Sequence, residues 1–453
     1  MKQHRILIAT DVPFWRKSTG AQTRISSLVD FLISESFVVR TFYLGQTNSE
    51  QFTDNDRQLI ASQELDVQQQ SSDQVPKSWV KKIGWYANQI RPKLSSDQAA
   101  NKPVDQANAE TLDSEPAANG SLCLEDFRWP WARQAFLDSV KQFQPDSILI
   151  EYVKLSYLID DLSSQQRNSI HCVIDTHDAL HLRNQRFKER GLVHWIEISR
   201  EEEAKELDKF DTVLAIQTDE AELFKTMAPH AKTIVCGHIP NTKPANQSGD
   251  NQKSTLPPTS TQPEILSIGY LASTNDSNFQ AIDSFIDSVW RPLKQQLSQE
   301  TGSQSQPAIE LVIGGSICKL LAPNQSTDPN IRLLGHVESL AGFYNSVDVV
   351  INPVEFGTGL KIKSVEGLAF GKPLISTAEG VVGLEQISTP PTQGARAIVI
   401  CHTPDQFVSE LKRLILEPSR LAALSEAANK LAQSAFSQQQ AYRPLKQLLL
   451  QGK

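Results

Sequence analysis

The sequence predicts an α/β protein of two domains, each built around a doubly wound parallel sheet. Short apolar runs typical of buried strands alternate with longer segments of helical periodicity. This alternation stops at a polar stretch, residues 243–262, and then begins again, and 453 residues suffice for two domains. We therefore expect a first domain over residues 1–242, a linker over 243–262, a second domain over 263–435 and a C-terminal helix over 436–453.

The first domain begins with a strand–helix–strand unit. Residues 6–9 are apolar, a loop around Gly20 follows, apolar residues then recur with helical spacing over 25–32, and residues 38–42 form a second strand. This Rossmann-like start lacks the G-x-G-x-x-G sequence, which argues against a nicotinamide-type site. Gly20 is a candidate for a loop that approaches a phosphate or the acceptor, and a plain turn glycine is the alternative.

A low-complexity insertion is expected at about residues 46–122. Gln, Asn, Ser and Asp dominate there, and such a composition buries too little apolar surface to order itself, so we expect it to be largely disordered. Residues 78–93 are an exception, because apolar side chains recur with helical spacing among basic ones. This island is either a helix that lies on a membrane surface or grips an acceptor, or a helix packed on the domain, which we favour.

The later segments continue the alternation of strands and helices. In the first domain we expect strands at 147–152, 172–175, 212–216 and 232–235, and helices ending near 143, spanning 199–210, and beginning at a cap formed by Thr218 or Asp219. In the second domain we expect strands at 264–269, 310–313, 331–334, 347–351 and 373–376, helices at 278–289 and 339–347, a helix from 360, and two or three helices at the end.

Composition excludes several classes of function. The net charge is −8 and no long basic block occurs, so nucleic acid is not expected as the main partner. The five cysteines are scattered without a C-x-x-C pair, which argues against a disulfide framework or a zinc site and fits a reducing cytosol. No signal peptide and no apolar run of about 18 residues is found. We expect a cytoplasmic protein, with peripheral contact at the inner face of a membrane as an option for residues 78–93.

Residues 357–373 carry the most chemical information. Gly357-Thr358-Gly359 allows a tight loop after a buried strand, and helical periodicity begins at Leu360. Lys363 and Glu366 are three residues apart and therefore share one face of the helix. The N–H groups of a helix N-terminus attract phosphate, a lysine adds charge, and a carboxylate accepts hydrogen bonds from both ribose hydroxyls. The pattern favours a nucleotide diphosphate site over an ordinary strand–helix unit with a surface Lys–Glu pair.

The second half resembles the C-terminal domain of the retaining glycosyltransferases of family four (glycosyl transferases group 1), which have the GT-B fold. The match is an ordered series of motifs over residues 264–384 and is specific for that reason; the first half matches loosely. The matching residues are 268–269, Asn278, 289–293, 311–315, 334–337, Asp348, 352–353, 357–366, 371–373, 376–377 and 380–384.

The resemblance implies a nucleotide-sugar donor held in the cleft between the two domains. The base would stack near His336 and Val337, Glu366 would hold the ribose, and Lys363 with Lys361 would neutralise the diphosphate. Backbone N–H groups near Leu360, in the loop of Thr358 and Gly359, would add to this. Neither a metal nor a cofactor is implied, and no D-x-D pair stands at a strand end.

The chain departs from the family pattern at two places. Many members carry a glutamate eight residues before the ribose glutamate, where this chain has Thr358. Many also carry an arginine and a lysine in the loop after the first strand of this domain, and residues 270–275 contain neither. Recognition of the donor sugar is therefore less well supported than binding of the nucleotide.

In the first half, His177 is the candidate catalytic residue. The family often has a histidine near this strand end, close to the transferred sugar; the alternative is a histidine that caps the strand or bonds Asp178. Glu151 also ends a strand, and for it we favour a structural role. Glu203 lies in a glutamate-rich segment, and we expect it to be solvated.

These observations predict a metal-independent retaining glycosyltransferase. It would move a hexosyl or related sugar from a nucleotide diphosphate donor to a glycan, a lipid-linked or another acceptor, in polysaccharide or glycoconjugate biosynthesis. Two alternatives remain: an epimerase or hydrolase of nucleotide sugars on the same fold, and an inactive binding or scaffold protein. The threonine at position 358 keeps the last alternative open.

Overall fold

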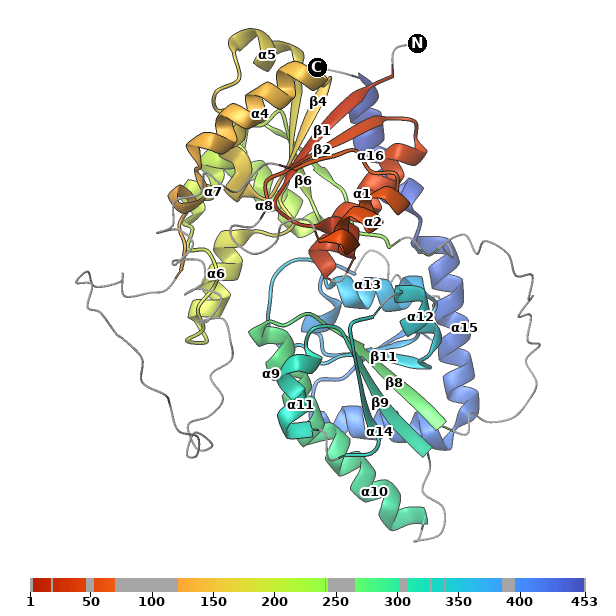
Figure 1. Ribbon diagram of the computed structural model, residues 1–453. Coiled ribbons are helices and arrows are strands. Elements are labelled where there is room, and N and C mark those ends of the chain that lie inside the picture. Colours follow the sequence, from red (N-terminus) through yellow and green to blue (C-terminus); the bar gives the residue numbers. More distant parts are fainter. Residues whose placement is uncertain are drawn as a thin grey trace.

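The chain forms two α/β domains that face each other across a cleft (Figure 1). The computed structural model describes residues 3–17, 19–45, 53–69, 121–240, 242, 265–301, 308–325, 328–337, 339–384 and 396–451. Every paired strand in both sheets is parallel. The predicted fold class of two doubly wound domains is confirmed.

The first sheet has the strand order β3-β2-β1-β4-β5-β6-β7. Its strands are β1 (Arg5–Thr10), β2 (Val38–Tyr43), β3 (Val67–Gln69), β4 (Ser147–Glu151), β5 (His171–Asp175), β6 (Thr212–Ala215) and β7 (Lys232–Val235). Along β1, Ile6 and Ile8 pack on one face of the sheet, and Leu7 and Ala9 on the other. Both faces are therefore covered, which explains why these strands are continuous apolar runs in the sequence.

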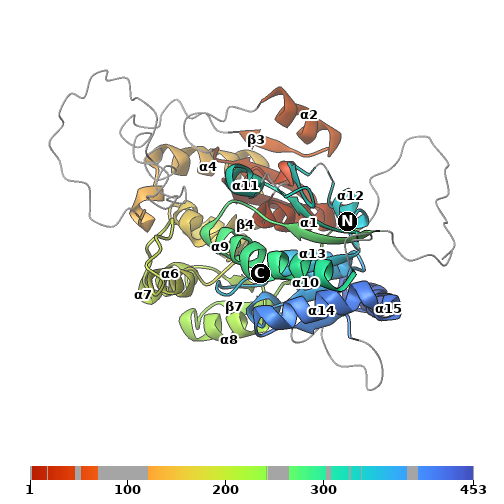
Figure 2. The same ribbon diagram turned by 90° about the horizontal axis from the view of Figure 1, so that it is seen from below.

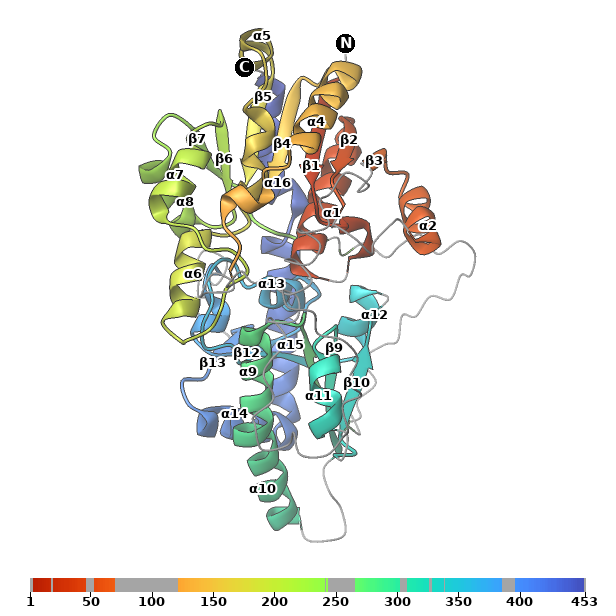
Figure 3. The same cartoon turned by 60° about the vertical axis from the view of Figure 1, so that its left-hand side comes forward.

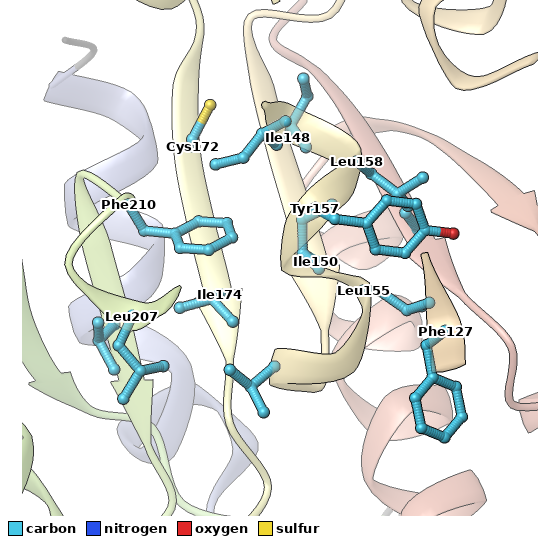
Figure 4. Packing of buried hydrophobic residues seen from close by; sticks show 14 of the residues in the cluster. Phe127, Ile148, Ile150, Leu155, Tyr157, Leu158, Cys172, Ile174, Leu207 and Phe210 are labelled. Atoms are coloured by element: carbon cyan, nitrogen blue, oxygen red, sulfur yellow. The ribbon is translucent and has the colours of Figure 1, made fainter. Parts of the chain in front are cut away.

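Helices cover both faces of this sheet. They are η1 (Phe14–Arg16), α1 (Gly20–Ser34), α2 (Asp54–Ser62), η4 (Leu124–Phe127), α4 (Pro130–Phe143), η5 (Val153–Ile159), α5 (Ser164–Ser169), α6 (Leu180–Lys188), α7 (Arg200–Leu207) and α8 (Thr218–Met227). Figure 4 shows one of the two cores, where Ile148 and Ile150 of β4 and Ile174 of β5 meet Tyr157 of η5 and Phe210. The N-cap of α8 is Gln217, not the predicted Thr218 or Asp219, and its side chain makes no capping bond.

Part of the predicted insertion is ordered. Helix α2 and strand β3 lie within residues 46–122, and β3 pairs with β2 as the edge of the sheet. Asp56 of α2 accepts hydrogen bonds from Trp15 Nε1 at 2.8 Å and Arg16 Nε at 2.7 Å, which fasten α2 to η1. The expectation of a largely disordered insertion is thus wrong for residues 53–69, because these polar bonds add to the packing of Leu59, Ile60, Leu65 and Val67 against the core. The island at 78–93 lies outside the described residues.

The second sheet repeats the arrangement of the first, with the order β10-β9-β8-β11-β12-β13. Its strands are β8 (Ile265–Leu271), β9 (Ala308–Gly314), β10 (Ile331–Gly335), β11 (Val349–Asn352), β12 (Leu374–Ser376) and β13 (Ile398–Ile400). The helices are α9 (Asp276–Phe285), a π-helical turn η6 (Ile286–Trp290), α10 (Arg291–Thr301), α11 (Cys318–Gln325), α12 (Leu340–Asn345), α13 (Ile362–Ala369), η7 (Glu379–Val381), α14 (Pro404–Leu416) and α15 (Pro418–Ala435). The linker at 243–262 lies outside the described residues.

The last helix, α16 (Gln438–Gln451), returns to the first domain (Figure 3). Helices α14 and α15 follow one another and contact each other in the second domain (Figure 2), whereas Tyr442, Leu445 and Leu449 of α16 pack into the core beneath α1. The predicted C-terminal helix is present, and it joins the two domains a second time. Among the described residues, no helix combines the length and the apolar character that crossing a membrane requires.

The sheets direct their carboxyl ends toward the cleft. In the first sheet the strand order reverses direction between β1 and β4, and in the second between β8 and β11. Such switch points are where open α/β sheets bind ligands, because the loops there diverge to opposite faces. This topology therefore points to the cleft as the functional site.

Candidate functional site

A cavity of about 530 Å³ lies between the two domains. It is lined by loops that follow β4, β5 and β6 of the first domain and β8, β9, β10 and β11 of the second. All ten predicted site residues line it: Gly20, His177, His336, Val337, Thr358, Gly359, Leu360, Lys361, Lys363 and Glu366. The fold thus brings these residues together from both halves of the chain; their individual roles stay predictions.

The loop before α13 depends on its glycines. Gly357 has a φ of 147° and Gly359 a φ of 68°, values that favour glycine. A Cβ at Gly359 would also lie only 3.2 Å from Asp178 Oδ1 of the first domain. The loop is therefore shaped for a close approach across the cleft, as the two glycines in the sequence indicate.

Lys363 lies in the first turn of α13, and no carboxylate among the described residues bonds its ammonium group. The group contacts the side-chain oxygen of Asn278, lies 3.4 Å from the Tyr270 hydroxyl and 4.9 Å from the centre of the Tyr270 ring. Burial, together with the charge of Lys361, lowers the pKa of Lys363 to about 7, against the opposing effect of Glu366. An anion entering the cavity would supply the missing negative charge.

Lys361 is more fully engaged than Lys363. Its Nζ lies 3.0 Å from Glu379 Oε1 and donates to the carbonyls of Thr358 and Gly359 at 3.3 and 3.4 Å. Burial lowers the pKa of Lys361, and Glu379 opposes this shift. In this structure Lys361 therefore supports the glycine loop while it also lines the cavity.

Glu366 lies one turn further along α13, against the first domain. Its carboxylate accepts from the Thr23 hydroxyl of α1 at 3.1 Å and from the Tyr344 hydroxyl at 3.2 Å, and His238 Nε2 lies 3.7 Å away. Burial lowers the pKa of His238, although Glu366 opposes it. A ribose in this place would take over the contact with Thr23.

Gly20, the first residue of α1, faces the start of α13. A Cβ there would lie 2.9 Å from Ile362 Cδ1, so only a glycine fits without movement of Ile362. Gly20 is therefore a contact between the two domains rather than a plain turn glycine. His336 is exposed at the end of β10, and Val337 packs against the backbone of Gly314 across the same rim.

His177 follows β5 and is held rigidly. Its φ is 59°, its ring stacks on Tyr152 with centroids 4.0 Å apart, and its Nε2 lies 2.5 Å from Glu151 Oε2. Burial raises the pKa of Glu151, and Asp175 adds to this while His177 opposes it. Glu151 is fully buried and bonds His177, which is the structural role favoured for it.

Glu151, Asp175 and His177 are a group with the spacing of metal ligands. However, Arg24 donates from Nε and Nη2 to Asp175 at 3.0 and 2.7 Å. Burial would raise the pKa of Asp175, but Arg24 outweighs it and the pKa is lowered. A guanidinium in this position would repel a cation, so this group is better suited to orient His177 than to bind metal.

Glu203 is not solvated, contrary to the expectation. It is 0% exposed and accepts hydrogen bonds from the N–H groups of Leu180 and His181 and from the His181 ring. Glu203 thus satisfies the N-terminus of α6, which otherwise has no side-chain cap. A run of glutamates in one helix did not reveal which of them faces inward.

Several lining residues were not singled out from the sequence. Lys17, Arg183 and Lys319 add positive charge to the cavity wall, and Asp178 adds a carboxylate. Asn278 accepts from Lys363. The glycine pair at the end of β9 is visible in the sequence and could have drawn attention to the loop that leads to Lys319. No comparable pattern precedes Lys17 or Arg183.

The family model described as "Glycosyl transferases group 1" matches residues 262–417, about a third of the chain. The match covers the second domain through α14 and includes the glycine loop and α13. Comparison with curated proteins gives no match.

Several solved structures are similar over nearly the whole chain. Sucrose-phosphate synthase from Thermosynechococcus elongatus has a TM-score of 0.62 at 14% identity, with 99% of each chain covered. Anabaena HepE in complex with UDP and glucose has a TM-score of 0.59 at 12% identity, covering 99% of this chain and 100% of that one. The pneumococcal O-GlcNAc transferase GtfA in complex with UDP and GlcNAc has a TM-score of 0.58 at 12% identity, covering 100% and 99%.

At these identities the likeness establishes the fold, which is GT-B as predicted. Together with the family match, it supports the glycosyltransferase class for this chain. The retaining mechanism, the acceptor and the independence from metal stay predictions.

Proposed function

We propose that the protein transfers a sugar, with retention, from a nucleotide diphosphate sugar to a glycan or lipid-linked acceptor. The observation that carries this proposal is the position of Lys363. Its ammonium group lies in the first turn of a helix, beside an interdomain cavity, and its hydrogen-bonding partners among the described residues are neutral. A diphosphate would pair with the charge of Lys363 and accept hydrogen bonds from the N–H groups at the start of the helix.

The charges of the cavity wall support an anionic donor. Lys17, Arg183, Lys319, Lys361 and Lys363 line the cavity, against the carboxylates of Asp178 and Glu366. Glu366, set one turn from Lys363, would accept hydrogen bonds from the ribose hydroxyls. Similar structures contain UDP or UDP-glucose, which suggests a uridine donor for this chain too.

Departure of the diphosphate would be the step that the chain assists most. Negative charge grows on the leaving diphosphate oxygen as the bond to the sugar breaks, and fixed cations stabilise that charge without a metal. The acceptor hydroxyl would attack from the same face, with its proton taken up by the departing diphosphate. His177, fixed by Glu151 and Tyr152, would orient the sugar and would not attack it.

The test is an assay of nucleoside diphosphate release. The purified protein is incubated with UDP-glucose, UDP-N-acetylglucosamine, GDP-mannose or ADP-glucose, with and without oligosaccharide or polyprenyl-linked acceptors. We expect release that depends on one donor and rises with an acceptor, and a product whose anomeric configuration, read by NMR, matches that of the donor. Binding of a donor without any release would instead identify a scaffold protein, and an inverted product would exclude retention.

A further inference from the structure

Three buried polar atoms of the cavity wall have no hydrogen-bond partner in the part of the chain that the structure describes: Asp178 Oδ1, Thr358 Oγ1 and Asn352 Oδ1. Asp178 belongs to the first domain, and Thr358 and Asn352 belong to the second. A buried polar atom without a partner costs free energy, so such atoms mark places where a ligand or water bonds. Their concentration around one cavity points to a ligand with several hydroxyl groups.

Asp178 is the best defined of the three. It is 4% exposed and follows β5, next to His177. Its Oδ2 accepts from Arg183 Nη1 at 2.9 Å, which fixes the carboxylate. Its Oδ1 points to the other side of the cleft, where a Cβ at Gly359 would be 3.2 Å away. One oxygen is thus held by Arg183, and the other is buried against the glycine loop without a hydrogen-bond partner among the described residues.

Thr358 is the immediate neighbour of this contact. Its hydroxyl is buried, lines the same cavity and can both donate and accept. Thr358 is the residue before Gly359, so Thr358 and the carboxylate of Asp178 both border the glycine loop and line the cavity. A carboxylate, which accepts hydrogen bonds, and a hydroxyl, which donates and accepts them, together match the hydroxyl groups of a sugar.

We propose that Asp178, assisted by Thr358, recognises hydroxyl groups of the transferred sugar. This inference rests on the proposed function and names its specificity-determining residue. The carboxylate of Asp178, from the first domain, would take the place of the glutamate that many family members carry where this chain has Thr358. The sugar would then be bound from the opposite side of the cleft. Because Asp178 and the diphosphate site lie on different domains, sugar recognition would also require both domains to close on the donor.

The test separates binding of the sugar from binding of the nucleotide. Calorimetry with UDP, GDP and ADP gives the affinity for each diphosphate, and the same measurement is made with the four nucleotide sugars of the release assay. The ratio of the affinity for a nucleotide sugar to that for its diphosphate is the sugar increment. In Asp178→Ala we expect diphosphate affinity to stay within about twofold, while the sugar increment falls by about tenfold to a hundredfold, as for a hydrogen bond to a charged group. Thr358→Val should lose about three- to tenfold of the same increment.

A donor series identifies the hydroxyl. Nucleotide sugars with single hydroxyls replaced by fluorine should bind the parent less tightly at one position, and Asp178→Ala should not distinguish that analogue from the normal donor. Asp160→Asn is the control: Asp160 also pairs with arginines but does not line the cavity, and it should behave like the parent. Should Asp178→Ala fold poorly, Thr358→Val gives the same comparison without loss of an ion pair.

Two results would overturn the inference. If both variants keep the full sugar increment, Asp178 serves only to fix Arg183 and the loop at Gly359. If the parent binds diphosphates as tightly as all of the nucleotide sugars, no sugar contact exists, although the nucleotide site would stand. Failure of the parent to bind either class would refute the proposed function as well.

Discussion

The two walls of the cleft differ in how their charges are satisfied. Behind the first-domain wall, Asp175 is paired with Arg24 at 2.7 Å, and Glu151 and Glu203 each lie 2.5 Å from a histidine. In the second-domain wall, the hydrogen-bonding partners of Lys363 among the described residues are neutral, and its pKa is lowered to about 7. The buried carboxylates behind the first wall therefore have partners within the protein. The ammonium group of Lys363 in the second wall would gain a charged partner when an anion binds.

This difference predicts that the buried pairs of the first domain contribute to stability and that Lys363 contributes to binding. A buried ion pair whose partner is removed leaves an isolated charge, so changes in the first wall should cost stability. A cation buried without a partner is unfavourable in the empty protein, so its removal should leave stability unharmed and weaken binding. Each prediction below tests one side of this contrast.

The largest effect is expected for Asp175→Ala. The change leaves Arg24 buried, 1% exposed, without its carboxylate, and such losses cost about 3–5 kcal/mol of unfolding free energy. Urea unfolding followed by circular dichroism measures it. Glu222→Ala, which breaks an exposed pair with Lys225, is the control and should cost no more than about 1 kcal/mol. Equal costs would show that the first wall is not specially dependent on its pairs.

Lys363→Ala should change binding rather than stability. A hydrogen bond to a charged group contributes about 1.5–3 kcal/mol, so affinity for the preferred nucleoside diphosphate should fall by that amount, and affinity for the nucleoside should hardly change. The melting temperature should not decrease. Lys430→Ala, on an exposed pair of α15, serves as control. A variant that binds the diphosphate as well as the parent does would remove Lys363 from the site.

His177→Gln should lower turnover by about tenfold or more while diphosphate affinity stays nearly constant, since the contact is made mainly in the transition state. The glutamine side chain keeps a hydrogen-bond donor for Glu151, so the buried carboxylate retains a partner. Steady-state kinetics and calorimetry together measure the two effects. Unchanged turnover would make His177 a structural residue, and lost binding would assign it to folding or closure.

The pH dependence of binding tests Lys363 in a second way. In the free protein Lys363 loses its proton near pH 7, and an adjacent diphosphate would raise its pKa. Binding above pH 7 therefore takes up a proton, and the affinity for a nucleotide sugar should fall by up to about tenfold per pH unit between pH 7 and 9. Titration calorimetry in two buffers of different ionisation enthalpy counts the proton. Lys363→Arg, which stays charged, should bind without that uptake.

The sequence predicted the parts of the molecule that depend on local pattern. The buried strands were apparent because both faces of each sheet are covered, and the residues from Gly357 to Glu366 form a site motif within one loop and one helix turn. By contrast, β13 was missed because its three residues are partly exposed at a sheet edge, and α6 because few of its residues are apolar.

Contacts between distant segments could not be predicted from one sequence. Thr23 bonds Glu366 across 343 residues, and Arg24 bonds Asp175 across 151. Nothing in a local pattern distinguishes Glu203 from its neighbours Glu201 and Glu202; only the fold places it under α6. The polar anchors of α2 escaped notice for the same reason, since Asp56 bonds residues about forty positions away.

The most direct test of the account is a thermal unfolding panel with UDP, GDP and ADP on the parent and on Lys363→Ala. A ligand at 100 times its dissociation constant stabilises the folded protein by about 2.7 kcal/mol. The account predicts that one nucleoside diphosphate raises the melting temperature of the parent clearly, and raises that of Lys363→Ala much less at the same concentration. Stabilisation of both proteins to the same extent, or of neither by any of the three, would contradict it.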